Sequence, residues 1–199
     1  FQLDYRLSYI KLYGVMNVGS NMNALVLFSG GLDSTTSLAI AKSMGYKITA
    51  LTINYKQRHD YEIMASKKIL SNYPDVKHII FDIDLTKIGG SALTDSSLDV
   101  PTQESTGIPI TYVPARNTIF LSIAASYAET LKIKNIFIGV NAIDYSGYPD
   151  CRPKFIASFE KMINLGTKSA SEGSPFKILT PLVSMTKSEI INTGIKLGV

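Results

Sequence analysis

The chain has 199 residues, 45% of them hydrophobic, so it can bury one sizeable core but is too short for two comfortable domains. Its 20 basic and 16 acidic residues give a net charge of +4, which suits an anionic ligand but is too mild to predict nucleic-acid binding. The single cysteine, Cys151, excludes an intramolecular disulfide and cannot by itself build a thiolate zinc site. We therefore expect one cytoplasmic domain.

The first 21 residues are fairly apolar, but Arg6 and Lys11 interrupt them and they are too short to span a bilayer. We expect neither a signal peptide nor a membrane partner. Because Met22 stands directly before a strand-like run, residues 1–21 are interpreted as an extension upstream of the native start, and residues 22–199 as the domain itself. An extra edge strand is the alternative for residues 1–21.

From Ala24 onward, short apolar runs alternate with segments of helical periodicity. The runs are β-branched and bounded by turn residues, which predicts strands buried on both faces at 24–28, 48–53, 76–81, 135–140 and 176–179. Helices are expected at 34–44, 60–72, 117–131, 153–165 and 186–197. The alternation predicts an α/β fold, an open doubly wound parallel sheet of about five strands with helices on both faces.

Residues 84–116 are too many for a simple connection and are rich in Ser, Thr, Asp, Gly and Pro. Such a segment is either a functional loop or lid over a site, or a plain surface insertion.

The most informative stretch is Ser-Gly-Gly-Leu-Asp-Ser at 29–34, directly between the first strand and the first helix. Glycines at a helix N-terminus expose backbone N–H groups where the helix dipole also favours an anion, which predicts a phosphate cradle. The Lys-Ser/Thr pair of a Walker A loop is missing, and the pattern is not G-x-G-x-x-G. It resembles the pyrophosphatase loop, whose enzymes cleave ATP between the α and β phosphates. A tight turn with an Asp or Ser cap is the plain alternative.

Other unusual segments follow the predicted strands. Residues 55–59 (Tyr-Lys-Gln-Arg-His) follow the second strand, residues 141–152 the fourth and residues 180–182 (Thr-Pro-Leu) the fifth, with Lys187 one turn into the last helix. In open α/β sheets, ligands bind beyond the carboxyl ends of the strands, where the strand order reverses. We therefore expect these segments to share one ligand edge with the loop.

Beyond the loop, the chain resembles the 7-cyano-7-deazaguanine synthase (QueC) family from about Met22 to its last residue. The matching positions are Tyr55, Gln57-Arg58-His59, Glu62, Val113-Pro114-Ala115-Arg116-Asn117, Gly139-Val140, Asp144, Ser146-Gly147-Tyr148-Pro149-Asp150-Cys151-Arg152, Phe155, Thr180-Pro181-Leu182 and Lys187. The stretch at 146–152 separates this family from its relatives.

The resemblance implies an adenine nucleotide alpha-hydrolase-like, Rossmann-like fold and a ligase that uses ATP, Mg²⁺ and ammonium to convert 7-carboxy-7-deazaguanine to a nitrile. The carboxylate would be adenylated, converted to an amide and activated a second time. No glutaminase module is visible, so we expect free ammonium as the nitrogen source. A homodimer is a possible assembly.

The resemblance also assigns roles to residues. The nucleotide set is Phe28, Ser29, Gly30, Gly31, Leu32, Asp33, Ser34, Arg116 and Lys187, of which Asp33, Ser34, Arg116 and Lys187 are the catalytic candidates. The substrate set is Tyr55, Gln57, Arg58, His59, Asp144, Tyr148, Asp150 and Arg152, with Tyr145 as a further stacking candidate. A surface charge is the alternative for each basic residue. His78 lies within a strand and is expected to be structural.

Family members continue into a cysteine-rich tail whose four thiolates hold zinc, whereas this chain ends at Val199 before any of them. Cys151 belongs to the substrate-loop motif, so we expect no metal ligands in the chain. A truncated gene product, a remnant that only binds nucleotide and an incompletely recorded chain are the alternatives.

Two rival functions share the sheet. A tRNA-modifying thiolase or an amide-forming synthetase would also share the loop, but such tRNA enzymes usually carry catalytic cysteines or an RNA-binding domain, and neither is seen. An electron-transfer or signalling domain would not need the loop.

Overall fold

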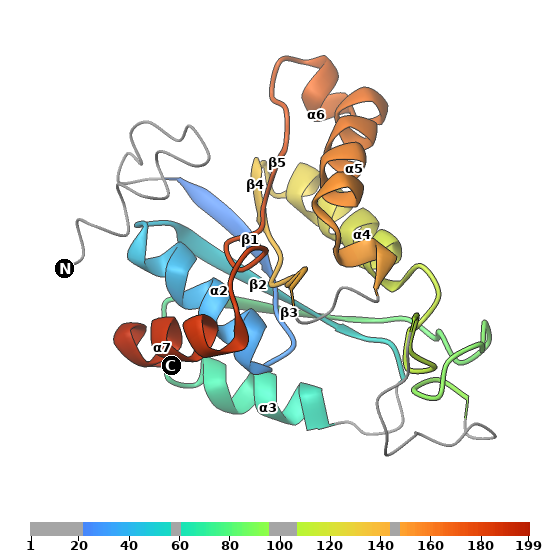
Figure 1. The fold of residues 1–199 in the computed structure, drawn as a ribbon. Coiled ribbons are helices and arrows are strands. Elements are labelled where there is room, and N and C mark those ends of the chain that lie inside the picture. Colours follow the sequence, from blue (N-terminus) through green and yellow to red (C-terminus); the bar gives the residue numbers. More distant parts are fainter. Residues whose placement is uncertain (1–21, 57–60, 96–106, 144–147) are drawn as a thin grey trace.

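The computed structural model describes residues 22–56, 61–95, 107–143 and 148–199 (Figure 1). Its strands are β1 (Asn23–Leu27), β2 (Lys47–Asn54), β3 (Lys77–Asp82), β4 (Asn135–Phe137) and β5 (Lys177–Leu179). They form one sheet in the order β3-β2-β1-β4-β5, and every neighbouring pair is parallel. The predicted five-stranded parallel sheet is confirmed.

Helices cover both faces of this sheet, as the alternating pattern predicts. They are α2 (Leu32–Ser43), α3 (Tyr61–Leu70), α4 (Arg116–Thr130), α5 (Pro153–Gly166), α6 (Lys168–Ser171) and α7 (Lys187–Leu197), with a 3₁₀ turn η1 (Pro149–Cys151). In Figure 1, α2, α3 and α7 lie on one face of the sheet, and α4 and α5 on the other. No helix in the described part of the chain is both long and apolar enough to cross a bilayer.

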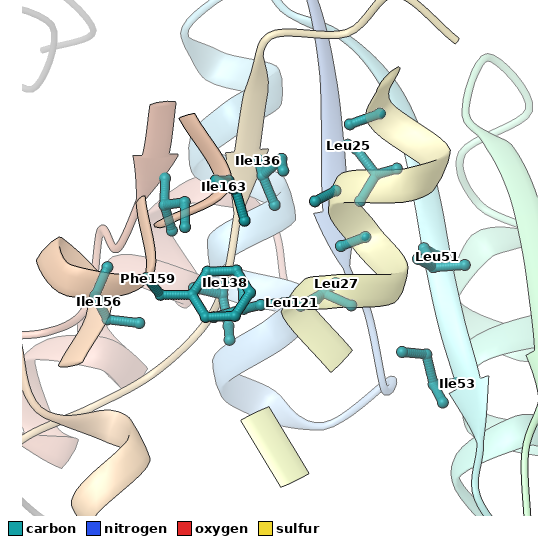
Figure 2. Packing of buried hydrophobic residues seen from close by; sticks show 14 of the residues in the cluster. Leu25, Leu27, Leu51, Ile53, Leu121, Ile136, Ile138, Ile156, Phe159 and Ile163 are labelled. Atoms are coloured by element: carbon teal, nitrogen blue, oxygen red, sulfur yellow. The ribbon is translucent and has the colours of Figure 1, made fainter. Parts of the chain in front are cut away.

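Alternate residues of the central strands build two separate cores. On β1, Leu25 and Leu27 pack under α4 and α5, whereas Ala24 and Val26 pack under α2. This alternation is the two-residue period of a strand with both faces covered. Figure 2 shows the first of these cores between the sheet and the two helices, with Leu121 of α4 facing the sheet.

The structure departs from the sequence prediction at two strands. β3 is only partly buried, so the prediction that both its faces are covered is wrong; it lies at the sheet edge, where β2 is its one neighbour. β4 ends at Phe137, three residues before its predicted end, although the Ile138 N–H still donates to the Leu179 carbonyl. Its partner β1 stops pairing with it at Val26, and the residues that follow β4 turn toward a cavity.

The two described ends of segment 84–116 fold against each other and against the core. The Ala92 N–H donates to the Ile110 carbonyl at 3.0 Å, and Leu85 and Val113 are buried in the core beneath α4. Residues 96–106 lie outside the described residues, so a lid role for this segment stays a prediction.

Candidate active site

A cavity of about 380 Å³ opens at the carboxyl ends of β1 and β4. These two strands are neighbours in space but not in sequence, so the strand order reverses between them, which is where open α/β sheets bind ligands. The volume lies within the range of roughly 300–1,000 Å³ that is usual for small-molecule sites. Of the segments expected at this edge, the first and second contribute Tyr55, Asn141, Tyr148 and Cys151 to the lining, and Lys187 joins them. Residues 180–182 do not line the cavity.

The Ser-Gly-Gly loop forms the polar end of this cavity. The backbone N–H groups of Ser29 and Gly30 both donate to the Ser34 hydroxyl oxygen at 3.2 Å, and that hydroxyl donates to the Gly31 carbonyl. Gly31 is the N-cap of α2 and accepts the first helical bond from the Thr35 N–H. The loop therefore gathers backbone and hydroxyl donors at a helix N-terminus, an arrangement that can hold a phosphate.

Two glycines let the backbone pass where a side chain would collide. Gly30 has a φ of 81°, and a Cβ there would lie 2.6 Å from the Ser66 backbone nitrogen of α3. A Cβ on Gly139, just beyond β4, would lie 2.9 Å from the Asp33 carbonyl carbon and oxygen. Because Gly30 and Gly139 lack a side chain, the loop can pack directly against the backbone of α3 and of the segment after β4.

Lys187 is the first residue of α7 and reaches into the cavity. Its Nζ donates to Asp33 Oδ1 at 2.9 Å, across 154 residues of sequence. Thr186 and Glu189 form a capping box that fixes this end of the helix. The buried Asn141 side chain donates to the Met185 carbonyl at 2.6 Å, tying the loop after β4 to the turn before α7.

The cavity lining also contains aromatic side chains and a second cation. Arg116, the first residue of α4, donates from Nη1 to the Tyr55 hydroxyl at 3.4 Å, with its guanidinium carbon 6.0 Å from the Tyr55 ring centroid. The Tyr55 ring lies 5.4 Å from that of Phe120. Glu62 of α3 also lines the cavity. A flat, partly polar ring could bind between these groups.

Burial and the neighbouring charges shift the pKa values of these groups. Burial raises the pKa of Tyr55 and outweighs the opposing effect of Arg116. Burial alone would lower the pKa of Arg116, but Tyr55, Asp150 and Glu62 together raise it above its ordinary value. Arg116 is therefore a permanent cation in this site.

The predicted site residues separate into three groups. Those that line the cavity are Phe28, Ser29, Gly31, Leu32, Asp33, Ser34, Tyr55, Arg116, Tyr148 and Lys187. Three described residues do not line the cavity. Gly30 packs against α3, and Asp150 is buried outside the cavity lining. Arg152 is exposed at the N-cap of α5. Gln57, Arg58, His59, Asp144 and Tyr145 lie outside the described residues.

The structure adds lining residues to which the sequence assigned no role. They are Leu27, Leu51, Ile53, Glu62, Asn117, Phe120, Ile138, Gly139, Val140, Asn141 and Cys151. Glu62, Asn117, Gly139, Val140 and Cys151 belong to the stretches that carried the family resemblance, so that signal could have included them. The other apolar ones follow from strand ends and from α4, and no local pattern distinguishes them from ordinary core residues.

The residues that the structure describes do not fit a structural zinc site. The described residues contain no group of three or more His, Cys, Asp or Glu side chains able to hold a metal. Cys151 is the chain's one cysteine, and its thiol accepts from Asn117 Nδ2 at 3.4 Å. Burial raises the pKa of this thiol to about 11, so it is held as a neutral thiol.

The fold has relatives among solved structures. NMN synthetase from Francisella tularensis superposes with a TM-score of 0.58 at 17% identity, covering 100% of this chain and 71% of that one. The U34-tRNA thiolase NcsA from Methanococcus maripaludis gives the same TM-score and identity over 98% of this chain and 64% of that one. At such identities the likeness shows the fold alone.

Sequence comparison places the chain in a family. The family model described as "Queuosine biosynthesis protein QueC" matches residues 23–199. The 7-cyano-7-deazaguanine synthase of Saccharophagus degradans is 54% identical over 180 residues, which are 90% of this chain and 80% of that protein. The 7-cyano-7-deazaguanine synthase of Cellvibrio japonicus is also 54% identical over 180 residues, again 90% of this chain and 80% of that protein. The loop, the reversal of strand order and these matches together show that the chain belongs to the QueC family.

Proposed function

We propose that the chain is an ATP-dependent carbon–nitrogen ligase that converts 7-carboxy-7-deazaguanine and ammonia to 7-cyano-7-deazaguanine. The observation that carries the proposal is the meeting of the Ser-Gly-Gly loop, Lys187 and Arg116 around one cavity. Relatives of 54% identity bear the name of that synthase.

The reaction requires the carboxyl carbon to lose both of its oxygens. A carboxylate oxygen attacks the α-phosphorus of ATP, releases pyrophosphate and leaves an acyl adenylate. Ammonia adds to the acyl carbon, a proton is lost, and AMP departs to give the amide. The amide oxygen attacks a second ATP in the same way, and loss of AMP and of both protons from the nitrogen leaves the nitrile.

The loop would hold the phosphates that leave. The N–H groups of Ser29 and Gly30 donate to the Ser34 hydroxyl at the N-terminus of α2, and they would exchange this partner for pyrophosphate oxygens as negative charge builds there. Lys187 stands beside the loop as a point charge for the same oxygens.

Arg116 would bind the oxygens at the reacting centre. Its planar guanidinium can pair with a carboxylate or a phosphate through two N–H groups, and the Tyr55 hydroxyl holds it at the cavity wall. Tyr55, Phe120 and Tyr148 present ring surfaces on which a deazaguanine could stack. Substrate contacts from Gln57, Arg58, His59, Asp144 and Arg152 stay predictions.

Mg²⁺ fits this site as an ion shared between phosphates and protein. It typically takes one or two carboxylates and fills its other positions with phosphate oxygens and water. From the sequence we expect no metal ligands, but Asp33 and Glu62 are carboxylates in the cavity lining and could provide those for Mg²⁺. When bound, Mg²⁺ would neutralise charge on the leaving pyrophosphate.

The test is turnover by the purified chain with 7-carboxy-7-deazaguanine, ATP, Mg²⁺ and ammonium, followed by mass spectrometry. The proposal predicts the nitrile, a transient amide and AMP, without added tRNA. ATP binding without any product would favour a remnant that only binds nucleotide. Product that required tRNA would favour a tRNA-modifying enzyme, and turnover on glutamine alone would contradict the use of free ammonium.

A further inference from the structure

The first turn of α4 is capped by a residue far from it in sequence. Its N-cap, Ala115, has a left-handed backbone (φ 54°, ψ 25°) and makes no side-chain cap bond. The first N–H groups of a helix have no partner within it and need one elsewhere. Asp150 of η1 fills this role, because its Oδ2 accepts the Asn117 N–H at 3.0 Å.

Two further hydrogen bonds connect Asn117 to η1. The Asn117 side chain donates from Nδ2 to the Asp150 carbonyl at 3.2 Å and to the Cys151 sulfur at 3.4 Å. Asp150, Asn117 and Cys151 are each at least 92% buried. These bonds form a clasp, the Asp150–Asn117 clasp, between η1 and the first turn of α4.

Arg116 is next to this clasp in the chain and lines the cavity. Its backbone directly precedes Asn117, while its guanidinium points to the Tyr55 hydroxyl. The Asp150 charge also helps to raise the pKa of the guanidinium. A carboxylate at a helix N-terminus is favoured by the helix dipole, which strengthens the cap.

We propose that Asp150 is a positioning residue that fixes Arg116 in the active site by capping α4, and that it makes no contact with the deazaguanine ring. A direct ring contact would need a carboxylate oxygen facing the cavity. Asp150 is instead 6% exposed, lies outside the cavity lining and accepts a backbone N–H through Oδ2. The inference rests on the proposed function only for the identity of the group that Arg116 binds.

The test combines amide hydrogen exchange with a double-mutant cycle. In Asp150→Ala, the amides of the first turn of α4 should exchange faster. In Asp150→Asn, whose carboxamide oxygen can still accept the Asn117 N–H, exchange should change less. Because exchange needs no turnover, this arm remains informative if the proposed reaction itself fails.

For the cycle, kcat/KM is compared among wild type, Asp150→Ala, Arg116→Gln and the double variant. Residues coupled by 0.5–3 kcal/mol show non-additive effects of about 2- to 150-fold. We expect Asp150→Ala to lower kcat/KM by about 10-fold or more in the wild-type background and by less than about 2-fold in the Arg116→Gln background. Asp150→Asn should recover most of the loss.

Glu160→Ala is the matched control. Glu160 of α5 also accepts a backbone N–H through its carboxylate, from Ile178 at 2.7 Å, but it lies outside the cavity lining. Glu160→Ala should lower the free energy of unfolding, and its effect on kcat/KM should be the same with and without Arg116→Gln. Two results would overturn the proposal: independent, multiplicative effects of Asp150→Ala and Arg116→Gln, or unchanged α4 exchange together with a raised KM for the deazaguanine in both Asp150 variants.

Discussion

Lys187 and Asp33 meet in the active site although they are separated by most of the chain. Lys187 is 44% exposed and Asp33 18%, so their ion pair lies at the cavity surface and is partly screened by water. The ion pair itself therefore stabilises the fold little. Its importance is that it holds a cation beside the loop that would bind phosphate.

Replacing Lys187 by Met should lower kcat/KM by about 10- to 150-fold, because a hydrogen bond from a charged donor is worth about 1.5–3 kcal/mol. The thermal unfolding temperature should change little. Steady-state kinetics in ATP gives the measurement. Lys42→Met is the control, since Lys42 pairs with Asp75 on the surface away from the cavity and should keep full activity.

Gly139 allows the chain after β4 to touch the backbone of the loop. Gly139→Ala places a methyl group 2.9 Å from the Asp33 carbonyl, so the loop or β4 must shift. We expect a loss of about 1–3 kcal/mol in the free energy of unfolding and a fall in turnover. Urea unfolding measures the change in the free energy of unfolding.

The control for that variant is Gly166→Ala, because a Cβ at the end of α5 would meet nothing within 4 Å. It should be neutral or slightly stabilising. Equal effects of the two alanines would show that Gly139 is not needed for close approach.

At the scale of elements, α7 is oriented by its own first turn. The Thr186 hydroxyl accepts the Glu189 N–H at 3.3 Å, and a Glu189 carboxylate oxygen accepts the Thr186 N–H at 2.8 Å. The bonds that the Thr186 N–H and hydroxyl donate to this carboxylate hold the pKa of Glu189 below its ordinary value. The same turn begins with Lys187, so the cap and the active site share one piece of backbone.

Thr186→Ala should lower the free energy of unfolding by about 1 kcal/mol through the lost cap. It should also weaken ATP binding, because the frayed turn no longer fixes Lys187. Thr186→Ser keeps the hydroxyl and should restore both properties. Calorimetric unfolding and titration with ATP measure them, and a stability loss with unchanged ATP affinity would show that the cap does not position Lys187.

The Thr52 hydroxyl links strands β2 and β3 to the residue before the loop. Thr52 of β2 donates to the carbonyl of Phe28, just before the loop, at 2.7 Å, and lies 2.8 Å from His78 Nε2 of β3. Since the Thr52 proton is used by Phe28, His78 donates to Thr52 from Nε2. His78 therefore has the structural role expected from its place in a strand.

This contact predicts a pH dependence of stability. Burial, with the nearby Lys67 charge, lowers the pKa of His78 from its ordinary 6.5. The unfolded chain then binds a proton more readily than the folded one, so His78 destabilises the fold progressively as the pH falls below about 6.5. Urea unfolding from about pH 8 to about pH 5 should show a shallower acid-side loss for His78→Asn than for wild type, and parallel profiles would contradict the assignment.

At the scale of the whole molecule, local pattern was enough to predict the sheet but not all of its edges. Short, near-continuous apolar runs in β1 and β2 identify strands covered on both faces, and the structure confirms them. β3 has similar apolar content, yet its burial depends on what the rest of the fold places over it, which the segment itself does not encode: the other edge strand, β5, is buried at Ile178 and Leu179, whereas β3 is only partly buried. The short α6 and η1 were missed because three or four residues carry no period.

In the candidate site, too, the sequence predicted some features and not others. The loop and Lys187 were expected together because they follow parallel strands, and the structure brings them to 2.9 Å. The place of Asp150 was not predictable, because a carboxylate in a turn can face a ligand or a helix end equally well. Only the packing of η1 on α4 decides between these.

The central claim is that this cavity activates a carboxylate by adenylation, and the most direct test follows its oxygens. The purified chain is given 7-carboxy-7-deazaguanine labelled with ¹⁸O in both carboxyl positions, and mass spectrometry locates the label. The account predicts that each nitrile formed is accompanied by two AMP molecules, each carrying one ¹⁸O. Label in inorganic phosphate together with ADP would instead show attack at the γ-phosphorus and contradict the assignment of the loop to the leaving pyrophosphate.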